Sequence, residues 1–234
     1  KYSDQLEQKL VNAVGKAIKN LEPSTLWSGQ GFTSFAVNRR NNKEAEVPKL
    51  RLAKELVGPV DHSVPILAVK DKAGKLKTIV FGYACHNTTV GIQQWCGDYA
   101  GFAQYDLEKM FPGVTAMFYI GCGADQNPIP RRTLELAKSY GSRLAHAVAD
   151  TVRLPLVELD PELKTSIEIF DVKLGDVPTK EELETLAAGN PNNYRVRWGT
   201  RLLKQLNSGK PFITSYPFPV EVWRLGKKHL WITI

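Results

Sequence analysis

Two stretches of sequence, KTIVFGYA at residues 77–84 and VTAMFYI at residues 114–120, decide the fold. Both are rich in β-branched and aromatic residues, which is typical of strands. Between them, residues 98–110 carry apolar residues at helical spacing and end before a Pro-Gly pair, and a longer helical pattern follows at residues 131–152. This order of strand, helix, strand and helix predicts parallel strands joined by right-handed crossovers, with the sheet buried between helices.

The loops that follow these two strands gather polar and glycine-rich residues. The first loop is CHNTT at residues 85–89, and the second is GCGADQNP at residues 121–128. In parallel α/β sheets the ligand crevice opens at the carboxyl ends of the strands. We therefore expect a functional site where these two loops meet.

Toward the N-terminus, apolar residues at spacings of three and four predict an amphipathic helix that begins after Ser3 and ends near Pro23. Residues 24–59 are polar and rich in turn formers, so we expect a long irregular connection there. Two β-rich runs, residues 64–70 and residues 77–84, flank the sequence DKAGK, which predicts a β-hairpin.

Toward the C-terminus, residues 165–172 alternate apolar and polar side chains as in a half-buried strand. A capping box formed by Thr179 and Glu182 predicts a helix over residues 179–188. The remaining predicted elements are a helix at residues 194–206, strands at residues 219–225 and 229–234, and a turn between these strands at residues 226–228.

These elements predict the α/β class, a mixed sheet with a parallel βαβα unit over residues 77–152 and helices packed on the sheet. The 234 residues suffice for a single α/β domain with a buried core. Because the sequence starts with Lys1 and stops at Ile234 inside an apolar strand, we expect it to be an incomplete portion of a larger domain.

The composition is that of an ordinary globular protein. Hydrophobic residues make up 43% and charged residues 24% of the chain, which excludes wholesale disorder and a disulfide scaffold. The net charge is 31 − 24 = +7, but the basic residues are scattered, so we expect no nucleic-acid partner. No apolar stretch reaches the roughly 18 to 20 residues that span a bilayer, so we expect no transmembrane segment.

His86 is the first candidate for chemistry because it lies shortly after a predicted strand, in a polar loop. An imidazole there could bind a metal or relay a proton near neutral pH, or it could hydrogen-bond the loop backbone. His62 is expected in a surface turn, and His146 and His229 in structural or solvated positions. The four histidines lack the spacing of a self-contained metal site.

Three further side chains leave alternatives open. Asp125 could act as an acid, as a base or as an orienting carboxylate, or it could cap a turn. Asp98 could cap the helix that follows it or orient the imidazole of His86. Arg39 is either solvated or bound to an anion. Cys122 follows an apolar strand, where a buried inert thiol is expected rather than a nucleophile.

Four motifs stand in a characteristic order along the chain. They are NRR at residues 38–40, GYACHNTT at residues 82–89, GDYAGFA at residues 97–103 and GCGADQNP at residues 121–128. In sequence, order and spacing they resemble the neutral/alkaline non-lysosomal ceramidase family. The resemblance covers most of the chain, which corresponds to the central part of that family's N-terminal catalytic domain. Members of the family are zinc-dependent amidases that split the N-acyl bond of ceramide.

The resemblance implies roles for three residues. His86 falls on a zinc ligand, and Arg39 falls on the arginine that holds a polar group of the substrate near the scissile amide. Asp98 matches an acidic residue in the turn that follows the ligand, and we expect it to serve catalysis. The family's other metal ligands correspond to positions outside this chain, so the remaining ligands of a zinc are expected there.

The loop at residues 125–128 departs from the family. The ceramidases have a serine in an Asp-x-Ser-Pro-Asn type loop, whereas this chain has Asp-Gln-Asn-Pro, which offers no hydroxyl. We therefore expect a mechanism without a serine nucleophile and a substrate that need not be ceramide. Asp125 is expected to take part in catalysis, and Asn38, Gln126 and Asn127 are expected to bind the substrate.

The leading functional expectation is a zinc-dependent hydrolase of an N-acyl (amide) or ester bond. Its zinc would lower the pKa of a bound water to roughly 7, while Arg39 and loop amides stabilise the oxyanion. The alternative is a non-catalytic domain on the same scaffold that binds a lipid or a glycan; a metal-free hydrolase using Cys122 ranks last. The resemblance also implies a lipid-like or N-acyl substrate, a role in sphingolipid metabolism, peripheral membrane contact and an extracellular or periplasmic location.

Overall fold

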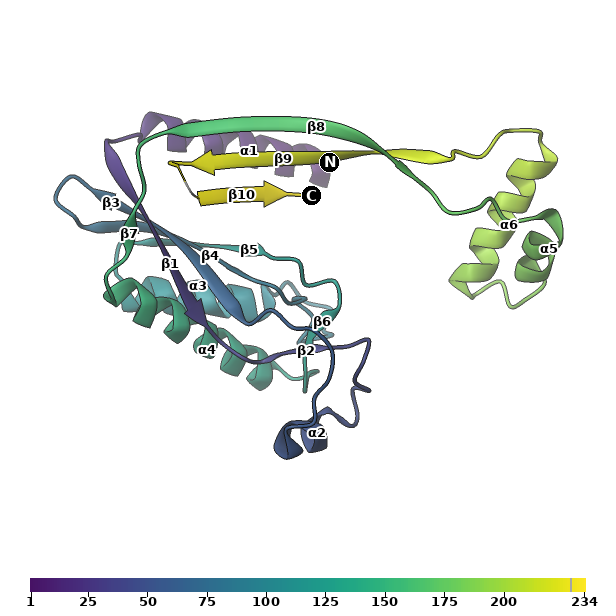
Figure 1. Cartoon of the computed structure of the whole chain (residues 1–234), viewed down its shortest axis with the longest axis horizontal. Helices are drawn as coiled ribbons and strands as arrows, with labels where there is room; N and C mark the ends of the chain where they lie inside the picture. The colour runs from purple at the N-terminus through teal and green to yellow at the C-terminus, as the bar shows by residue number, and fades with distance from the viewer. Residues whose placement is uncertain (228) are drawn as a thin grey trace. The chain divides into compact units, whose positions relative to one another are not determined.

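The computed structural model describes residues 1–227 and 229–234, which form two compact units, Lys1–Pro161 and Glu162–Ile234 (Figure 1). Its mixture of helices and strands confirms the predicted α/β class. The expectation of a single domain stays a prediction. Among the described residues, no helix has both the length and the apolar character needed to cross a membrane.

The first unit is built around a five-stranded mixed sheet. Its helices are α1 (Tyr2–Lys19), α2 (Val47–Ala53), α3 (Asp98–Met110) and α4 (Leu134–Arg153). Its strands are β1 (Ser24–Phe32), β2 (Ala36–Asn38), β3 (Ser63–Asp71), β4 (Leu76–Tyr83), β5 (Thr115–Ile120), β6 (Gln126–Pro128) and β7 (Val157–Glu158). The main sheet has the order β5-β4-β3-β1-β7, and β2 pairs with β6 in a separate antiparallel ribbon.

The predicted βαβα unit is confirmed as β4, α3, β5 and α4. Strands β4 and β5 are parallel, and their last residues, Tyr83 and Ile120, are paired in register. The predicted hairpin is also confirmed, because β3 and β4 pair antiparallel across a turn in which the Asp71 carboxylate accepts two backbone N–H groups. The carboxyl ends of β4 and β5 therefore lie side by side, as the ligand-crevice argument requires.

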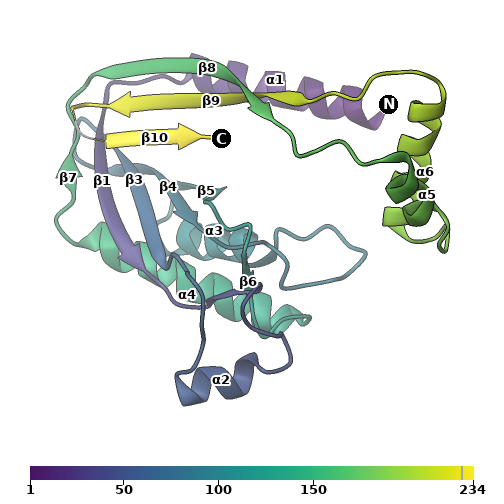
Figure 2. The same cartoon turned by 45° about the vertical axis from the view of Figure 1, so that its right-hand side comes forward.

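The expectation that helices enclose the sheet on both faces is wrong. The buried residues Ile66, Phe81 and Tyr83 belong to one core cluster, which also takes in residues of helices α3 and α4, such as Leu107 and Leu144. Helices α3 and α4 contact one another and cover the same face of the sheet (Figure 2). A one-sided core forms because the main sheet is mixed: only the β4–α3–β5 crossover forces a helix onto a face.

The long irregular connection predicted at residues 24–59 is also wrong, because β1, β2 and α2 lie within it. Gly29 and Gly31 are among the turn formers of this stretch, but they lie inside β1, where α4 crosses the strand. A Cβ at Gly31 would lie 2.9 Å from the carbonyl oxygen of Ala147, and one at Gly29 would lie 2.6 Å from the Leu156 side chain. These glycines permit close packing of strand and helix rather than a turn.

The helix ends follow their capping groups. The predicted N-terminal helix is confirmed as α1, although none of its residues is buried. Helix α4 begins three residues later than expected because the Thr133 hydroxyl accepts the Leu136 N–H and caps it there. Asp98 is the first residue of α3 and Gly97 holds the capping position, so the expectation of Asp98 as N-cap is wrong.

The second unit is a three-stranded antiparallel sheet with a helical hairpin inserted between two of its strands. Its elements are β8 (Leu163–Lys173), α5 (Lys180–Ala187), α6 (Tyr194–Asn207), β9 (Ser215–Leu225) and β10 (His229–Thr233), with the sheet order β10-β9-β8. The predicted capping box is confirmed by reciprocal hydrogen bonds between Thr179 and Glu182. Every residue of β8 is exposed, so the half-buried strand expected there is wrong in its burial. The turn predicted at residues 226–228 includes Lys228, which lies outside the described residues.

Candidate active site

The loop that carries His86 leaves the sheet at the end of β4 and joins the second predicted loop. The backbone N–H of His86 donates to the carbonyl of Gln126 at 3.0 Å, and the N–H of Gly121 donates to the carbonyl of Tyr83 at 3.1 Å. The imidazole is half-buried, and its Nε2 is fully buried without a hydrogen-bond partner among the described residues. A buried polar atom left without a partner is costly. In this loop the atoms in that state, among the described residues, are the His86 ring nitrogen and the Thr89 hydroxyl, and of the two the imidazole is the metal-binding type.

Arg39 reaches the same loops from β2. Its backbone N–H donates to the Asp125 carbonyl at 2.8 Å, which extends the β2–β6 ribbon by one bond. Its Nε and Nη2 both donate to the carbonyl of Ala124, at 3.2 and 3.0 Å. Although the residue is exposed, its guanidinium is therefore tied to the loop at residues 121–128. Arg39 therefore lies against the second of the two loops.

Asn38 is the buried connection between these segments, with 2% of its surface exposed. Its Nδ2 donates to the carboxylate of Asp125 at 3.0 Å and to the carbonyl of Pro59 at 2.9 Å. Its Oδ1 accepts the backbone N–H groups of Arg40 and Asn41. Both ends of the amide are thus used within the protein, so in this structure Asn38 holds the Asp125 carboxylate in place.

Gln126 and Asn127, which were expected to bind substrate, are each only 3% exposed. The Gln126 side-chain oxygen accepts the Asp61 N–H at 3.1 Å, and the Asn127 side-chain oxygen lies 3.5 Å from the Thr88 hydroxyl. Both amides therefore fasten the loop from within.

The Asp98 carboxylate is buried and bound to backbone. One oxygen accepts the Val90 N–H at 2.9 Å, and the other accepts the Tyr99 N–H at 2.7 Å. These bonds accompany a left-handed backbone at Asp98, where φ is +53°, a conformation that aspartate tolerates better than most residues. Asp98 therefore fixes the chain that returns from the His86 loop to α3.

The cysteines divide in a way that the sequence does not predict. Burial raises the pKa of the Cys85 thiol, and the Tyr99 hydroxyl donates to the Cys85 carbonyl at 2.6 Å. Cys122 is exposed, so the buried thiol expected there is wrong. It lies between Gly121 and Gly123, which are both in close contact with the chain at Ala84. The two glycines lie where the loop packs closely against Ala84, and the Cys122 side chain between them is exposed to solvent.

Three arginines near the β2–β6 ribbon make contacts that the sequence does not predict. The half-buried Arg51 guanidinium donates to the carbonyls of Ser34 and Ile129, at 3.1 and 2.7 Å, and burial lowers its pKa. Arg131 and Arg132 pair with the Glu44 carboxylate, and the hydrogen bond from Arg131 contributes most to lowering the Glu44 pKa. Glu44 and Arg132 are 88 positions apart in the sequence, so local periodicity cannot predict that they pair.

The other histidines have structural roles. The His62 ring bonds to the Ala36 carbonyl at 3.0 Å and packs edge-on against Phe32, so it is more than the surface turn residue expected. His146 bonds to the carbonyl of Ser142 within α4, as a structural residue does. Among the described residues, no three His, Cys, Asp or Glu side chains gather as a metal site. The unsatisfied Nε2 of His86 fits one ligand of a zinc, and the three or four ligands that zinc needs are not all present here.

Comparison with known proteins gives a structural match. No protein-family model matches the sequence, and no curated protein matches it. Neutral ceramidase from Pseudomonas aeruginosa matches with a TM-score of 0.62 and 16% sequence identity, covering 92% of this chain and 41% of that chain. A ceramidase complexed with C2 matches with a TM-score of 0.60 and 16% identity, covering 91% and 42%. This chain, which spans about two fifths of the length of these ceramidases, has the fold of a neutral ceramidase-like region.

Proposed function

We propose that this chain is part of a zinc-dependent, ceramidase-like hydrolase that splits an N-acyl (amide) or ester bond. The observation that carries the proposal is the buried Nε2 of His86, which follows the carboxyl end of a parallel strand and has no hydrogen-bond partner among the described residues. The ceramidase-like fold supports it. Because the chain spans about two fifths of those proteins, we propose that the activity belongs to a longer protein, whose other residues would supply the remaining zinc ligands.

The residues of this chain would hold the site in shape and supply one zinc ligand, but they would not supply all of the ligands. A zinc bound at His86 Nε2 would lower the pKa of a bound water and polarise the substrate carbonyl. Arg39 holds its guanidinium over the loop through the Ala124 carbonyl, in a position to bind a polar group of the substrate. Asn38 and Asp98 keep the two loops in register through buried hydrogen bonds.

The proposed chemistry needs no acyl-enzyme intermediate. Gln126 and Asn127 occupy the place where the ceramidase family has its serine, and neither can form an acyl ester. Asp125 remains as the acid or base of this loop, and the hydrogen bond from Asn38 holds its carboxylate in place. We propose that turnover shows no covalent burst and that another N-acyl or ester substrate is preferred over long-chain ceramide.

We further propose an extracellular or periplasmic protein that contacts membranes peripherally, acts in sphingolipid metabolism on a lipid-like substrate and has no nucleic-acid partner. The ceramidase-like fold supports this setting. The competing function is a non-catalytic lipid- or glycan-binding domain. The non-catalytic function is favoured by the small number of metal ligands. The described residues offer one unpartnered histidine nitrogen and no cluster of three His, Cys, Asp or Glu side chains that could hold a metal ion.

The test compares His86→Ala with His146→Ala in the full-length protein that contains this chain. His146 is an exposed histidine on α4 and serves as the matched control. We expect one zinc per chain in the wild type and in His146→Ala, measured by elemental mass spectrometry, and no zinc and no hydrolysis of an acyl-substrate panel in His86→Ala. Stoichiometric zinc in His86→Ala would contradict the ligand assignment. A zinc-free wild type that hydrolyses nothing would favour the binding domain.

A further inference from the structure

The helical hairpin of the second unit presents a surface that its own packing leaves open. Helix α6 packs against α5 through Val196 and Gly199, which are buried. A Cβ at Gly199 would lie 3.0 Å from Leu186, so the two helices are in close contact on that side. The residues of α6 on the opposite side take no part in this contact between the two helices.

Basic residues follow helical spacing on that opposite side. Arg197, Arg201 and Lys204 are separated by four and then three positions, which places them along one stripe, and all three are exposed. No acidic residue occurs within α6. Tyr194 and Trp198, which are 67% and 43% exposed, lie beside the stripe at the same spacing. We call these five residues the α6 outer face.

An apolar hollow adjoins the α6 outer face. It has a volume of about 460 Å³ and lies between α6 and the chain segments that enter and leave the hairpin. Its apolar walls include Trp198 and Leu202 of α6, and Leu174, Val177, Phe212 and Ile213 of the neighbouring segments. One acidic residue, Asp176, and one basic residue, Arg201, also line it, and the cations of the α6 outer face outnumber this carboxylate. Ile213 is 68% exposed and Val177 is 45% exposed. Cations, aromatic rings and aliphatic side chains therefore meet at one place on the hairpin.

We propose that the α6 outer face, with its adjoining hollow, docks the protein on a membrane surface that contains anionic lipid. Lys and Arg are attracted to the negative headgroups, and aromatic and aliphatic side chains bury their surface at the boundary of headgroups and acyl chains. A helix of this kind, basic on one edge and aromatic on the other, lies in the plane of the interface. The proposal deepens the peripheral membrane contact proposed above by assigning the residues that make it.

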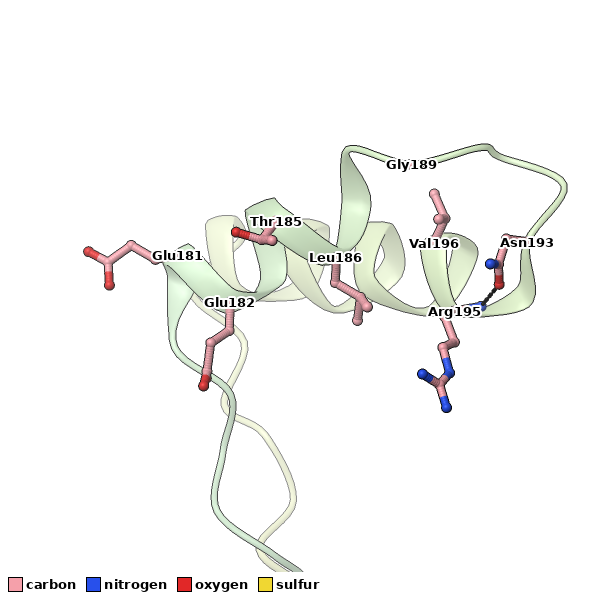
Figure 3. Close-up of a pocket in the computed structure, with 8 residues that line it drawn as sticks. All are labelled: Glu181, Glu182, Thr185, Leu186, Gly189, Asn193, Arg195 and Val196. Atoms are coloured by element: carbon pink, nitrogen blue, oxygen red, sulfur yellow. Dashed lines mark hydrogen bonds between the residues drawn. The ribbon is translucent and has the colours of Figure 1, made fainter.

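Other features of the unit fit this role less well. A second hollow, of about 490 Å³, lies beside α5 and α6 and is bordered by Leu186, Gly189 and Val196. In Figure 3 the carboxylate of Glu181 and the guanidinium of Arg195 lie at opposite ends of it, so its charges do not converge on one ligand. Nucleic acid would bind the cations of the α6 outer face, but it would not bury the exposed Ile213 side chain or fill the aliphatic hollow.

The test measures binding of the full-length protein that contains this chain to sedimented vesicles. One set of vesicles is pure phosphatidylcholine, and the other carries about 30% phosphatidylserine, at roughly 0.1 M salt. We expect binding to the anionic vesicles only. The combined variant Arg197→Gln, Arg201→Gln and Lys204→Gln should lower the partition coefficient about 100-fold, because each cation contributes about fivefold. Trp198→Ala should lower it roughly tenfold.

The matched control is Lys9→Gln, Lys16→Gln and Lys19→Gln on α1. Helix α1 also combines exposed lysines with exposed apolar residues. The control variant therefore removes the same amount of charge from a comparable surface. We expect the control to bind like the wild type. Far-ultraviolet circular dichroism should show that both variants are folded. Among the described residues, the side-chain hydrogen bond that the outer-face variant loses is the one from Arg197 to the Asn192 carbonyl.

Three outcomes would overturn the proposal. They are equal binding to neutral and anionic vesicles, an equal loss of binding in the α1 control, and no vesicle binding at all. Binding of a single-stranded oligonucleotide in place of vesicles would assign the cations to nucleic acid and would overturn it as well. None of these measurements depends on hydrolysis, so a failure of this proposal is distinct from a failure of the proposed enzyme activity.

Discussion

Gly123 is the point where the two candidate loops touch, and replacing it with alanine should separate them. A Cβ at this position would lie 2.5 Å from the backbone nitrogen of Cys85 and 2.6 Å from the carbonyl carbon of Ala84. Carbon contacts are favourable at about 3.5 Å or more, so the shortfall is about 1 Å. Both neighbours are backbone atoms directly before His86, and they cannot move aside as a flexible side chain can.

We expect Gly123→Ala to lower the free energy of unfolding by about 2 to 3 kcal/mol, the cost of forcing an extra carbon into a closely packed site. With a urea dependence of about 2 kcal/mol per M, the denaturation midpoint should fall by about 1 to 1.5 M. The nuclear magnetic resonance signals of the His86 ring should shift as well, because the loop that carries it is displaced. Cys85, which shares the contact, should become more accessible to thiol reagents.

The control for this experiment is Gly91→Ala. Gly91 lies in the same long loop as His86, but a Cβ there would meet no atom within 4 Å, so we expect a change below about 0.5 kcal/mol. The reasoning is refuted if Gly123→Ala unfolds at the same urea concentration as Gly91→Ala. An unchanged His86 spectrum in a destabilised Gly123→Ala variant would show that the loops move without disturbing the candidate site.

Three further predictions concern buried and charged groups. Asn38→Ala should lower the unfolding free energy by about 2 to 4 kcal/mol in urea titrations, because four partly buried hydrogen bonds lose one partner; an unchanged midpoint would contradict its role. Arg131 lowers the Glu44 pKa, so the folded state binds fewer protons and this stabilisation is present above about pH 4.5 and is lost at lower pH. The difference in stability between wild type and Glu44→Gln should therefore shrink as the pH falls from 6 toward 3. Cys85 should resist iodoacetamide at pH 8 while the two exposed cysteines react, as mass spectrometry of the intact chain would show.

The sequence by itself determined the local elements. Periodic apolar residues predict α3, β5 and α4, and the parallel pairing of β4 with β5 follows from the crossover between them. The capping box at Thr179 and the hairpin turn at Asp71 are also local, because their hydrogen bonds join residues at most four positions apart. The edge of the sheet where polar residues gather is likewise readable from the sequence, since parallel strands end at a common edge.

Tertiary structure alone decided the contacts that give the candidate site its chemistry. Asn38 meets Asp125 across 87 positions, and Gly31 admits α4 against β1, although its residue type reads as a turn. The exposure of Cys122 and the unpartnered Nε2 of His86 also depend on which segments arrive from elsewhere in the chain. Periodicity reports which face of an element is apolar, but the path of the chain determines what that face meets. The physical reason is that burial and hydrogen bonding are properties of the three-dimensional neighbourhood, which no local pattern encodes.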